Sequence, residues 1–242
     1  AIEDSIGFLE TVARQSLDAL ERVDFYTSHE ALLLPYEEAV TREVPHKTGH
    51  YNLSTHMPWV GKRTNQPDKA HVEYARGIRN PLGLKVGPNM APSDLKTLIG
   101  ILDPEDEPGR LTLITRFGAD DVADRLPNMI GAVRETGQSV LWVCDPMHGN
   151  TEKTAGGVKT RRFATILHEL EQTVDIHAAE GSHLGGVHFE LTGEDVTECI
   201  GGARGLDEAD LERAYKSHVD PRLNYEQALE MAFSLVRKYR TT

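Results

Sequence analysis

The sequence has few cysteines, no long apolar run and no excess of positive charge. Its two cysteines, Cys144 in an apolar segment and Cys199 in a polar one, are too few for a disulfide framework. No apolar run approaches the roughly 20 residues that a membrane-spanning helix needs, and no signal peptide is recognised ahead of the first expected helix. We therefore expect a cytoplasmic protein with no membrane partner.

The charge balance argues against a nucleic-acid partner. The formal net charge is −12, and no segment carries the basic patch that a surface following a phosphate backbone requires. Any bound phosphate must therefore be held locally. With 242 residues, 39% of them hydrophobic, the chain is long enough to bury a sizeable core, and we expect a single domain over residues 1–242.

Segments with strand and helix periodicity alternate along the chain, which predicts an α/β protein. Parallel strands joined by helices occur in closed barrels and in doubly wound sheets. A closed (β/α)8 barrel needs eight strands, and only six are predicted, so in that case two strands would be missing. The predicted strands are residues 23–28, 57–61, 82–86, 111–115, 140–144 and 187–191. The predicted helices are residues 2–20, 68–79, 92–102, 119–136 and 163–179, and two that begin near 207 and 225.

Polar side chains at the ends of these strands are the main functional signal. The sequence DPMHGNT at residues 145–151 directly follows an apolar run, and such strand ends carry the chemistry of barrel enzymes. Four strands bring Lys85, Arg116, His148 and Glu190 to or near their ends. We therefore predict that these side chains meet at one mouth.

Two kinds of site can be built from these residues. His148 and Glu190, with Asp220 further along the chain, supply one nitrogen and two carboxylates, a set that suits a divalent metal better than a structural zinc. Lys85 and Arg116 form a cationic pair that suits a phosphate or carboxylate.

Each of these residues also has a simpler interpretation. His148 is consistent with an ordinary loop histidine, and Asp220 with a turn before Pro221. Lys85 and Arg116 are consistent with ion-pair partners of acids on neighbouring strands. Glu190 is harder to explain in this way, because a carboxylate in the middle of a strand is expensive unless it is paired or bound to metal.

Five motifs in order along the chain resemble the type II 3-deoxy-D-arabino-heptulosonate 7-phosphate (DAHP) synthases of plants and bacteria. They are YTSHEA at 26–31, NPLGLKV at 80–86, DPMHGNT at 145–151, GSHLGGVHFELTGEDVTECIGG at 181–202 and DPRLN at 220–224. The resemblance implies a (β/α)8 barrel enzyme that condenses phosphoenolpyruvate (PEP) with erythrose 4-phosphate at the entry to the shikimate pathway. It also implies a homo-oligomer, and a plastid location if the chain comes from a plant.

The resemblance assigns roles to individual residues. The family's divalent metal, commonly Mn²⁺ or Co²⁺, is held by a Cys, a His, a Glu and an Asp, of which the last three match His148, Glu190 and Asp220. The PEP-binding Lys and Arg match Lys85 and Arg116. The family's metal-binding Cys lies on the first barrel strand, and neither cysteine of this chain matches it. We therefore expect that the first two strands and the N-terminal extension are absent.

One further motif departs from the family pattern. Residues 59–68 read WVGKRTNQPD where the family usually has WIGERTRQLD, so Lys62 replaces an acid beside Arg63, which is expected to reach substrate phosphate. This reversal of charge leaves the aldehyde substrate open, and a synthase of the amino analogue of DAHP is an alternative. Glu30 is a candidate for orienting a residue that contacts substrate.

Two other interpretations remain open. The chain is also consistent with a noncatalytic paralogue or subunit that keeps the ligand motifs, and less well with a metal-dependent hydrolase. In the favoured interpretation, a metal polarises the aldehyde of erythrose 4-phosphate while Lys85 and Arg116 hold PEP.

Overall fold

The computed structural model describes residues 24–240, so the helix predicted at 2–20 lies outside the described residues. Its central feature is a six-stranded parallel sheet in which each strand pairs with the previous one in chain order. The strands are β1 (Ser28–Glu30), β4 (Met57–Val60), β5 (Leu82–Val86), β6 (Leu111–Thr115), β7 (Leu141–Cys144) and β10 (Leu184–Val187). The predicted parallel α/β architecture is thus confirmed.

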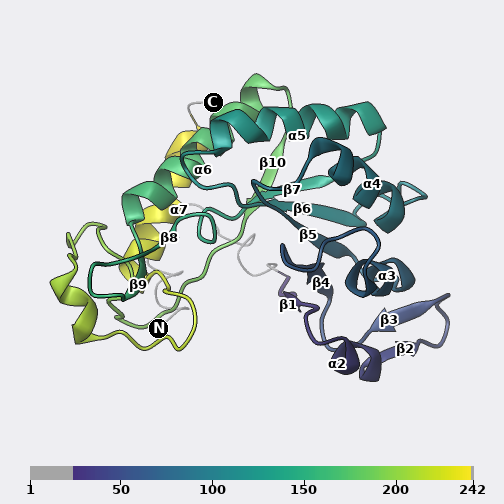
Figure 1. Ribbon diagram of the computed structural model, residues 1–242, viewed down its shortest axis with the longest axis horizontal. Coiled ribbons are helices and arrows are strands. Elements are labelled where there is room, and N and C mark those ends of the chain that lie inside the picture. The colour runs from purple at the N-terminus through teal and green to yellow at the C-terminus, as the bar shows by residue number, and fades with distance from the viewer. Residues whose placement is uncertain (1–23, 241–242) are drawn as a thin grey trace, which may run out of the picture.

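The described residues form six α-helices. They are α2 (Leu34–Ala39), α3 (Ala70–Gly77), α4 (Pro92–Leu102), α5 (Val122–Thr136), α6 (Phe163–Ala179) and α7 (Tyr225–Tyr239). From α3 to α7, each helix packs against the next, and Figure 1 shows α3 to α6 along the outside of the curved sheet. A sequential strand order with neighbouring helices on one side is compatible with a barrel, because a doubly wound sheet reverses its strand order part-way.

Local sequence explains where several helices begin and end. Pro92 opens α4 at a position where its missing N–H is not needed. Gly137 ends α5 in the left-handed conformation, with φ of 72°, which glycine adopts without steric cost. Asn224 caps α7 in a reciprocal pair of hydrogen bonds with Gln227.

The core lies between the sheet and the helices. Every residue of β5 and β6 is buried, which agrees with strands covered on both faces. Leu84 and Leu113 from these strands belong to the same apolar cluster as Leu98 of α4 and Leu126 of α5. The site-bearing ends of these strands are therefore fixed by a well-packed interior.

The structure corrects the bounds of two predicted strands. The first was predicted at 23–28, whereas β1 begins at Ser28, because only residues 28–30 pair with β4. The last was predicted at 187–191, whereas β10 is Leu184–Val187 and contains the glycine pair. A Cβ atom on Gly185 would lie 2.3 Å from Leu141 Cδ1, so a larger residue there would require the partly exposed Leu141 side chain to move.

Two hairpins and one short helix also differ from prediction. No strand was predicted between residues 28 and 57, yet this stretch contains the hairpin of β2 (Thr41–Glu43) and β3 (His50–Asn52). A second unpredicted hairpin pairs β8 (Thr151–Lys153) with β9 (Lys159–Arg161). The helix predicted from about residue 207 is only a 3-10 turn, η2 (Ala209–Arg213).

None of the described helices has both the length and the apolar character that crossing a membrane requires.

The central strands should dominate stability. We expect Leu113→Ala to lower the free energy of unfolding by about 2–5 kcal/mol, because Leu113 is fully buried in β6 and its truncation leaves a cavity. Leu229→Ala is the matched control, since that side chain is 56% exposed on α7. Chemical denaturation followed by circular dichroism measures both, and equal effects of the two substitutions would contradict this description of the core.

Candidate functional site

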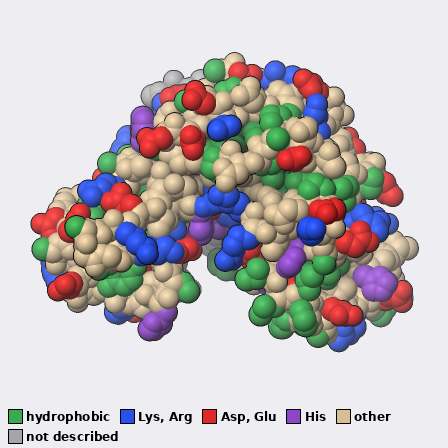
Figure 2. Space-filling view, viewed as in Figure 1, with side chains coloured by type: hydrophobic (Ala, Val, Ile, Leu, Met, Phe, Trp, Pro, Cys, Tyr) green, Lys and Arg blue, Asp and Glu red, His purple; other side chains and the backbone are tan. Residues whose placement is uncertain are grey.

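The strand ends meet at one cavity of about 710 Å³, and all eight predicted site residues line it. Figure 2 shows Lys, Arg and His side chains gathered where the molecule is hollowed. The cavity is lined by Glu30, Trp59, Gly61, Lys62, Arg63, Lys85, Arg116, His148, Lys159, His188, Glu190, Val219 and Asp220. It therefore combines two carboxylates near one histidine with five lysine and arginine side chains.

Three of the lining residues can share one metal ion. His148 Nε2 lies 3.2 Å from a Glu190 oxygen and 3.7 Å from an Asp220 oxygen. All three ligand atoms lie within 4.8 Å of one another. One nitrogen and two carboxylate oxygens at this separation fit a divalent cation of intermediate hardness.

The buried carboxylate of Asp145 orients the histidine of this group. One Asp145 oxygen lies 2.7 Å from His148 Nδ1, and the other accepts the His148 backbone N–H at 3.1 Å. With Nδ1 held in this way, Nε2 points at Glu190 and Asp220. Asp145 and His188 form a second possible metal group with His148, but Asp145 is already bonded to Lys85 and is fully buried.

The ionisation of these groups follows from their contacts. Burial lowers the pKa of His148, but its bonds to Asp145 and Glu190 outweigh burial and raise the pKa to about 9. Burial raises the pKa of Asp145, and the contacts with His148 and Lys85 hold it well below its usual range. By contrast, burial lowers the pKa of His188 to about 4, so this ring is neutral at physiological pH.

Two cations of the β8–β9 hairpin contact the carboxylates and were not predicted. Arg161 is fully buried and donates to Glu190, while Lys159 donates to Asp220. Arg161 Nη2 finds no hydrogen-bond partner in the part of the chain that the structure describes. A sequence with three cations among residues 159–162 is typical of an exposed hairpin, so nothing in it indicates this burial.

A cationic group lies beside the carboxylates. Lys85 is 5% exposed, bonded to Asp145, and its ammonium lies 5.7 Å from the centre of the Trp59 ring. Arg116 follows β6 and donates to the backbone carbonyl of His148. Burial lowers the pKa of Lys85, although Asp145 opposes this effect. The pairing with Asp145 holds the Lys85 ammonium in place and agrees with the simpler interpretation of this residue as an ion-pair partner. Lys85 nevertheless lines the cavity.

Comparisons with known proteins identify the family of the chain. The model of the Class-II DAHP synthetase family matches residues 1–236. This chain belongs to the class-II DAHP synthetase family. A protein of Neurospora crassa named phospho-2-dehydro-3-deoxyheptonate aldolase is 49% identical over 255 residues, covering 99% of this chain and 53% of that protein.

A Streptomyces coelicolor protein of the same name is 46% identical over 240 residues, with 99% of this chain and 53% of that protein covered. The chain thus spans about half the length of the curated relatives it matches. The family resemblance predicted from five motifs is confirmed.

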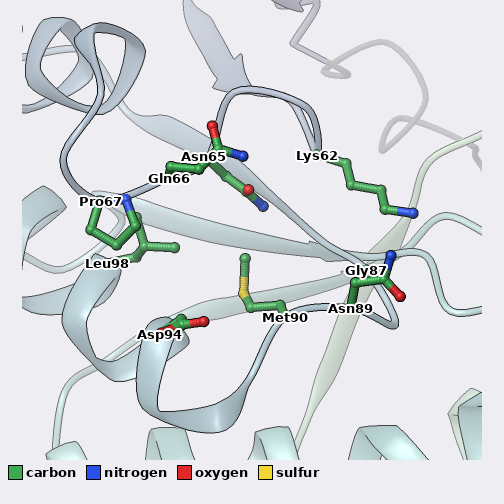
Figure 3. A pocket seen from close by; sticks show the side chains of 9 residues that line it. All are labelled: Lys62, Asn65, Gln66, Pro67, Gly87, Asn89, Met90, Asp94 and Leu98. Atoms are coloured by element: carbon green, nitrogen blue, oxygen red, sulfur yellow. The ribbon is translucent and has the colours of Figure 1, made fainter.

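Three residues form the rim of the cavity in this member of the family. Arg63 Nη2 lies 3.8 Å from a Glu30 oxygen, so the acid and the guanidinium face each other. Lys62 lines both the main cavity and a neighbouring pocket of about 320 Å³. Figure 3 shows its side chain extending away from Asn65 and toward Gly87. Burial and the nearby Arg116 lower the pKa of Lys62.

The structure places Glu190 and Asp220 differently from the sequence interpretation. Glu190 was expected within the last strand, but it lies three residues after β10, in a loop at the mouth. Its carboxylate therefore does not interrupt a strand interior. The Asp220 side chain contacts Lys159 and His148 and forms no backbone turn bond, so the simple turn interpretation of that residue is wrong.

A second buried acid, Glu198, holds the loop that carries Asp220. Its carboxylate accepts backbone N–H groups of Lys216, Ser217 and Arg222 at 3.0, 2.9 and 2.8 Å. It also pairs with the Arg222 guanidinium at 2.7 Å. Burial raises the pKa of Glu198, but these donors outweigh burial and hold the pKa below its usual range.

We expect Glu198→Gln to lower the free energy of unfolding by about 2–4 kcal/mol at pH 7, because the bonded charge is lost. The folded pKa lies below the unfolded value of about 4.3, so the ionised form is favoured in the folded state. The difference between variant and wild type should therefore shrink as the pH falls below about 4.3. Denaturation at pH 7 and at pH 3 measures it, because the contribution is lost only as the pH falls toward the folded pKa. The control Glu194→Gln removes an acid that is 54% exposed and pairs with Lys216. A Glu198→Gln effect no larger than this control, or equal at both pH values, would contradict the assigned role.

Proposed function

We propose that this chain carries a large part of the active site of a DAHP synthase, which condenses PEP with erythrose 4-phosphate to give DAHP and inorganic phosphate. The reaction is the first step of the shikimate pathway to aromatic amino acids. The observation that supports this proposal most is that a group able to bind metal and a cluster of cations face one cavity in a member of this family. The group able to bind metal suits an aldehyde oxygen, and the cluster of cations suits a phosphorylated acid.

His148, Glu190 and Asp220 would hold the divalent metal, with Mn²⁺ or Co²⁺ as the proposed ion. The donor set fits such an ion, as the distances above indicate. When bound, the ion would supply Lewis acidity at the aldehyde oxygen of erythrose 4-phosphate. Asp145 supports this site from behind by fixing the tautomer of His148.

Lys85 and Arg116 would bind the phosphate and carboxylate of PEP. Lys85 is buried and tied to Asp145, so little conformational freedom is lost when substrate binds. With PEP fixed, its C3 forms a bond to the aldehyde carbon of erythrose 4-phosphate, water adds at C2, and phosphate leaves. The chain contributes through position and charge, and no covalent intermediate with the protein is needed.

Arg63 and Lys62 would contact a substrate phosphate at the rim. Glu30 would orient Arg63, because the two side chains face each other. Lys62 adds a positive charge at the junction of two cavities, and this charge favours an anionic aldehyde such as erythrose 4-phosphate.

We also propose the finer points of architecture. The sequential parallel sheet would be part of a (β/α)8 barrel whose first two strands and N-terminal extension lie outside these residues, and residues 1–242 would form one domain with it. The greater length of the relatives supports this proposal. The protein would act in the cytoplasm, or in the plastid of a plant, as a homo-oligomer.

The direct test is an enzyme assay with Mn²⁺, PEP and erythrose 4-phosphate that follows the ultraviolet absorbance of PEP. We expect consumption of PEP that requires the aldehyde, either by the chain alone or after addition of the N-terminal segment of a relative. We expect His148→Ala to weaken Mn²⁺ binding about 100-fold and to abolish turnover, because it removes a metal ligand. The matched control is His168→Ala, since His168 is exposed on α6.

Calorimetry measures the Mn²⁺ affinity of each variant. Absence of turnover under both conditions, in a protein that still binds PEP and Mn²⁺, would favour a noncatalytic subunit over the enzyme. Unchanged Mn²⁺ affinity in His148→Ala would reject the assigned metal site.

A further inference from the structure

Glu169 is a buried acid outside the cavity that joins two of the loops lining it. It lies on α6 and is 1% exposed. One oxygen accepts the backbone N–H groups of Phe117 and Gly118, both at 2.9 Å. The other accepts from Asn150 Nδ2 at 2.6 Å. A single carboxylate therefore receives three hydrogen bonds from two separate loops.

These bonds lie next to the residues that face substrate. Phe117 directly follows Arg116, and Asn150 lies two residues after His148. The Asn150 side chain also accepts the N–H of Ala119 at 3.0 Å, which ties the two loops together again.

The two loop backbones also touch, close to the carboxylate. A Cβ atom on Gly149 would lie 2.3 Å from the backbone nitrogen of Gly118, so only glycine permits this contact. Arg116 donates across the same junction to the His148 carbonyl. Glu169 thus stabilises the contact between the two loops, and this contact sets the direction of the Arg116 side chain.

We infer that Glu169 is a positioning residue for PEP binding and that it acts through Arg116. This inference rests on the proposed function. Two of its three bonds fix the backbone immediately after Arg116, and a guanidinium binds a planar anion well only when its orientation is fixed. A buried carboxylate that merely filled space would be expensive, and burial does raise the pKa of Glu169 to about 7.

Loss of the Glu169 carboxylate should weaken PEP binding more than metal binding. The backbone and ring of His148 are held independently by Asp145, so its orientation does not depend on Glu169 alone. Arg116 is held at one guanidinium nitrogen by the His148 carbonyl and at its backbone N–H by Val86 at 2.8 Å, but its Nε finds no hydrogen-bond partner in the described chain. Loss of the Glu169 carboxylate should therefore disturb the anion site more than the metal site.

The test is a double-mutant cycle on PEP binding by calorimetry with wild type, Glu169→Gln, Arg116→Lys and the double variant. Glutamine keeps one oxygen for the two backbone N–H groups but turns an NH₂ group toward the NH₂ of Asn150. We expect Glu169→Gln to weaken PEP binding about tenfold in the wild-type background and less than about twofold in the Arg116→Lys background. Mn²⁺ binding without PEP should change less than about threefold.

Glu171→Gln is the matched control, because it makes the same substitution on the same helix at a partly exposed position, and it should leave PEP affinity unchanged. If Glu169→Gln does not fold, Asn150→Ala removes the third bond to Glu169 together with the side-chain bonds to Ala119 and Pro146, and it should also weaken PEP binding more than Mn²⁺ binding. Near-ultraviolet circular dichroism checks that each variant is folded.

Three results would overturn the inference: unchanged PEP affinity in Glu169→Gln, equal losses in both backgrounds, or a parallel tenfold loss of Mn²⁺ affinity. The last would mark Glu169 as a general structural residue. If the wild-type protein itself does not bind PEP, the proposed function is wrong, and the inference that rests on it is wrong as well.

Discussion

The buried carboxylate of Asp145 connects the two halves of the candidate site. It accepts from Lys85 on one side and from His148 on the other, and it is fully buried at the end of β7. One negative charge thus fixes both a cation that lines the cavity and the histidine of the possible metal group. A buried pair that loses one partner leaves an uncompensated charge, which typically costs about 3–5 kcal/mol. The positions of both functional groups therefore depend on this one acid.

Two further buried acids stabilise loops at the cavity by accepting their backbone N–H groups. Glu169 receives N–H groups from the loop after β6, and Glu198 receives N–H groups from the loop that carries Asp220. Loops at strand ends have few backbone partners of their own, and a carboxylate from behind satisfies several donors at once. Neither acid is among the residues that line the cavity, so they hold its loops without adding negative charge to it.

Much of this could be predicted from sequence, because strand ends and motifs are local signals. The apolar runs at β5, β6 and β7 predicted those strands and brought Lys85, Arg116 and His148 together. Arg161 could not be predicted, because its burial comes from carboxylates about 30 and 60 residues away in the chain. The bounds of β10 were missed for a related reason: pairing with β7, and not β-propensity, decides that a glycine pair forms the strand.

The most direct test of the shared metal site is anomalous X-ray diffraction from crystals of this protein grown with Mn²⁺. We predict one strong anomalous peak that lies about 2–2.5 Å from His148 Nε2 and from one oxygen each of Glu190 and Asp220. A peak between Asp145 and His188, or no peak near His148 at saturating Mn²⁺, would contradict the assignment of these three residues as ligands.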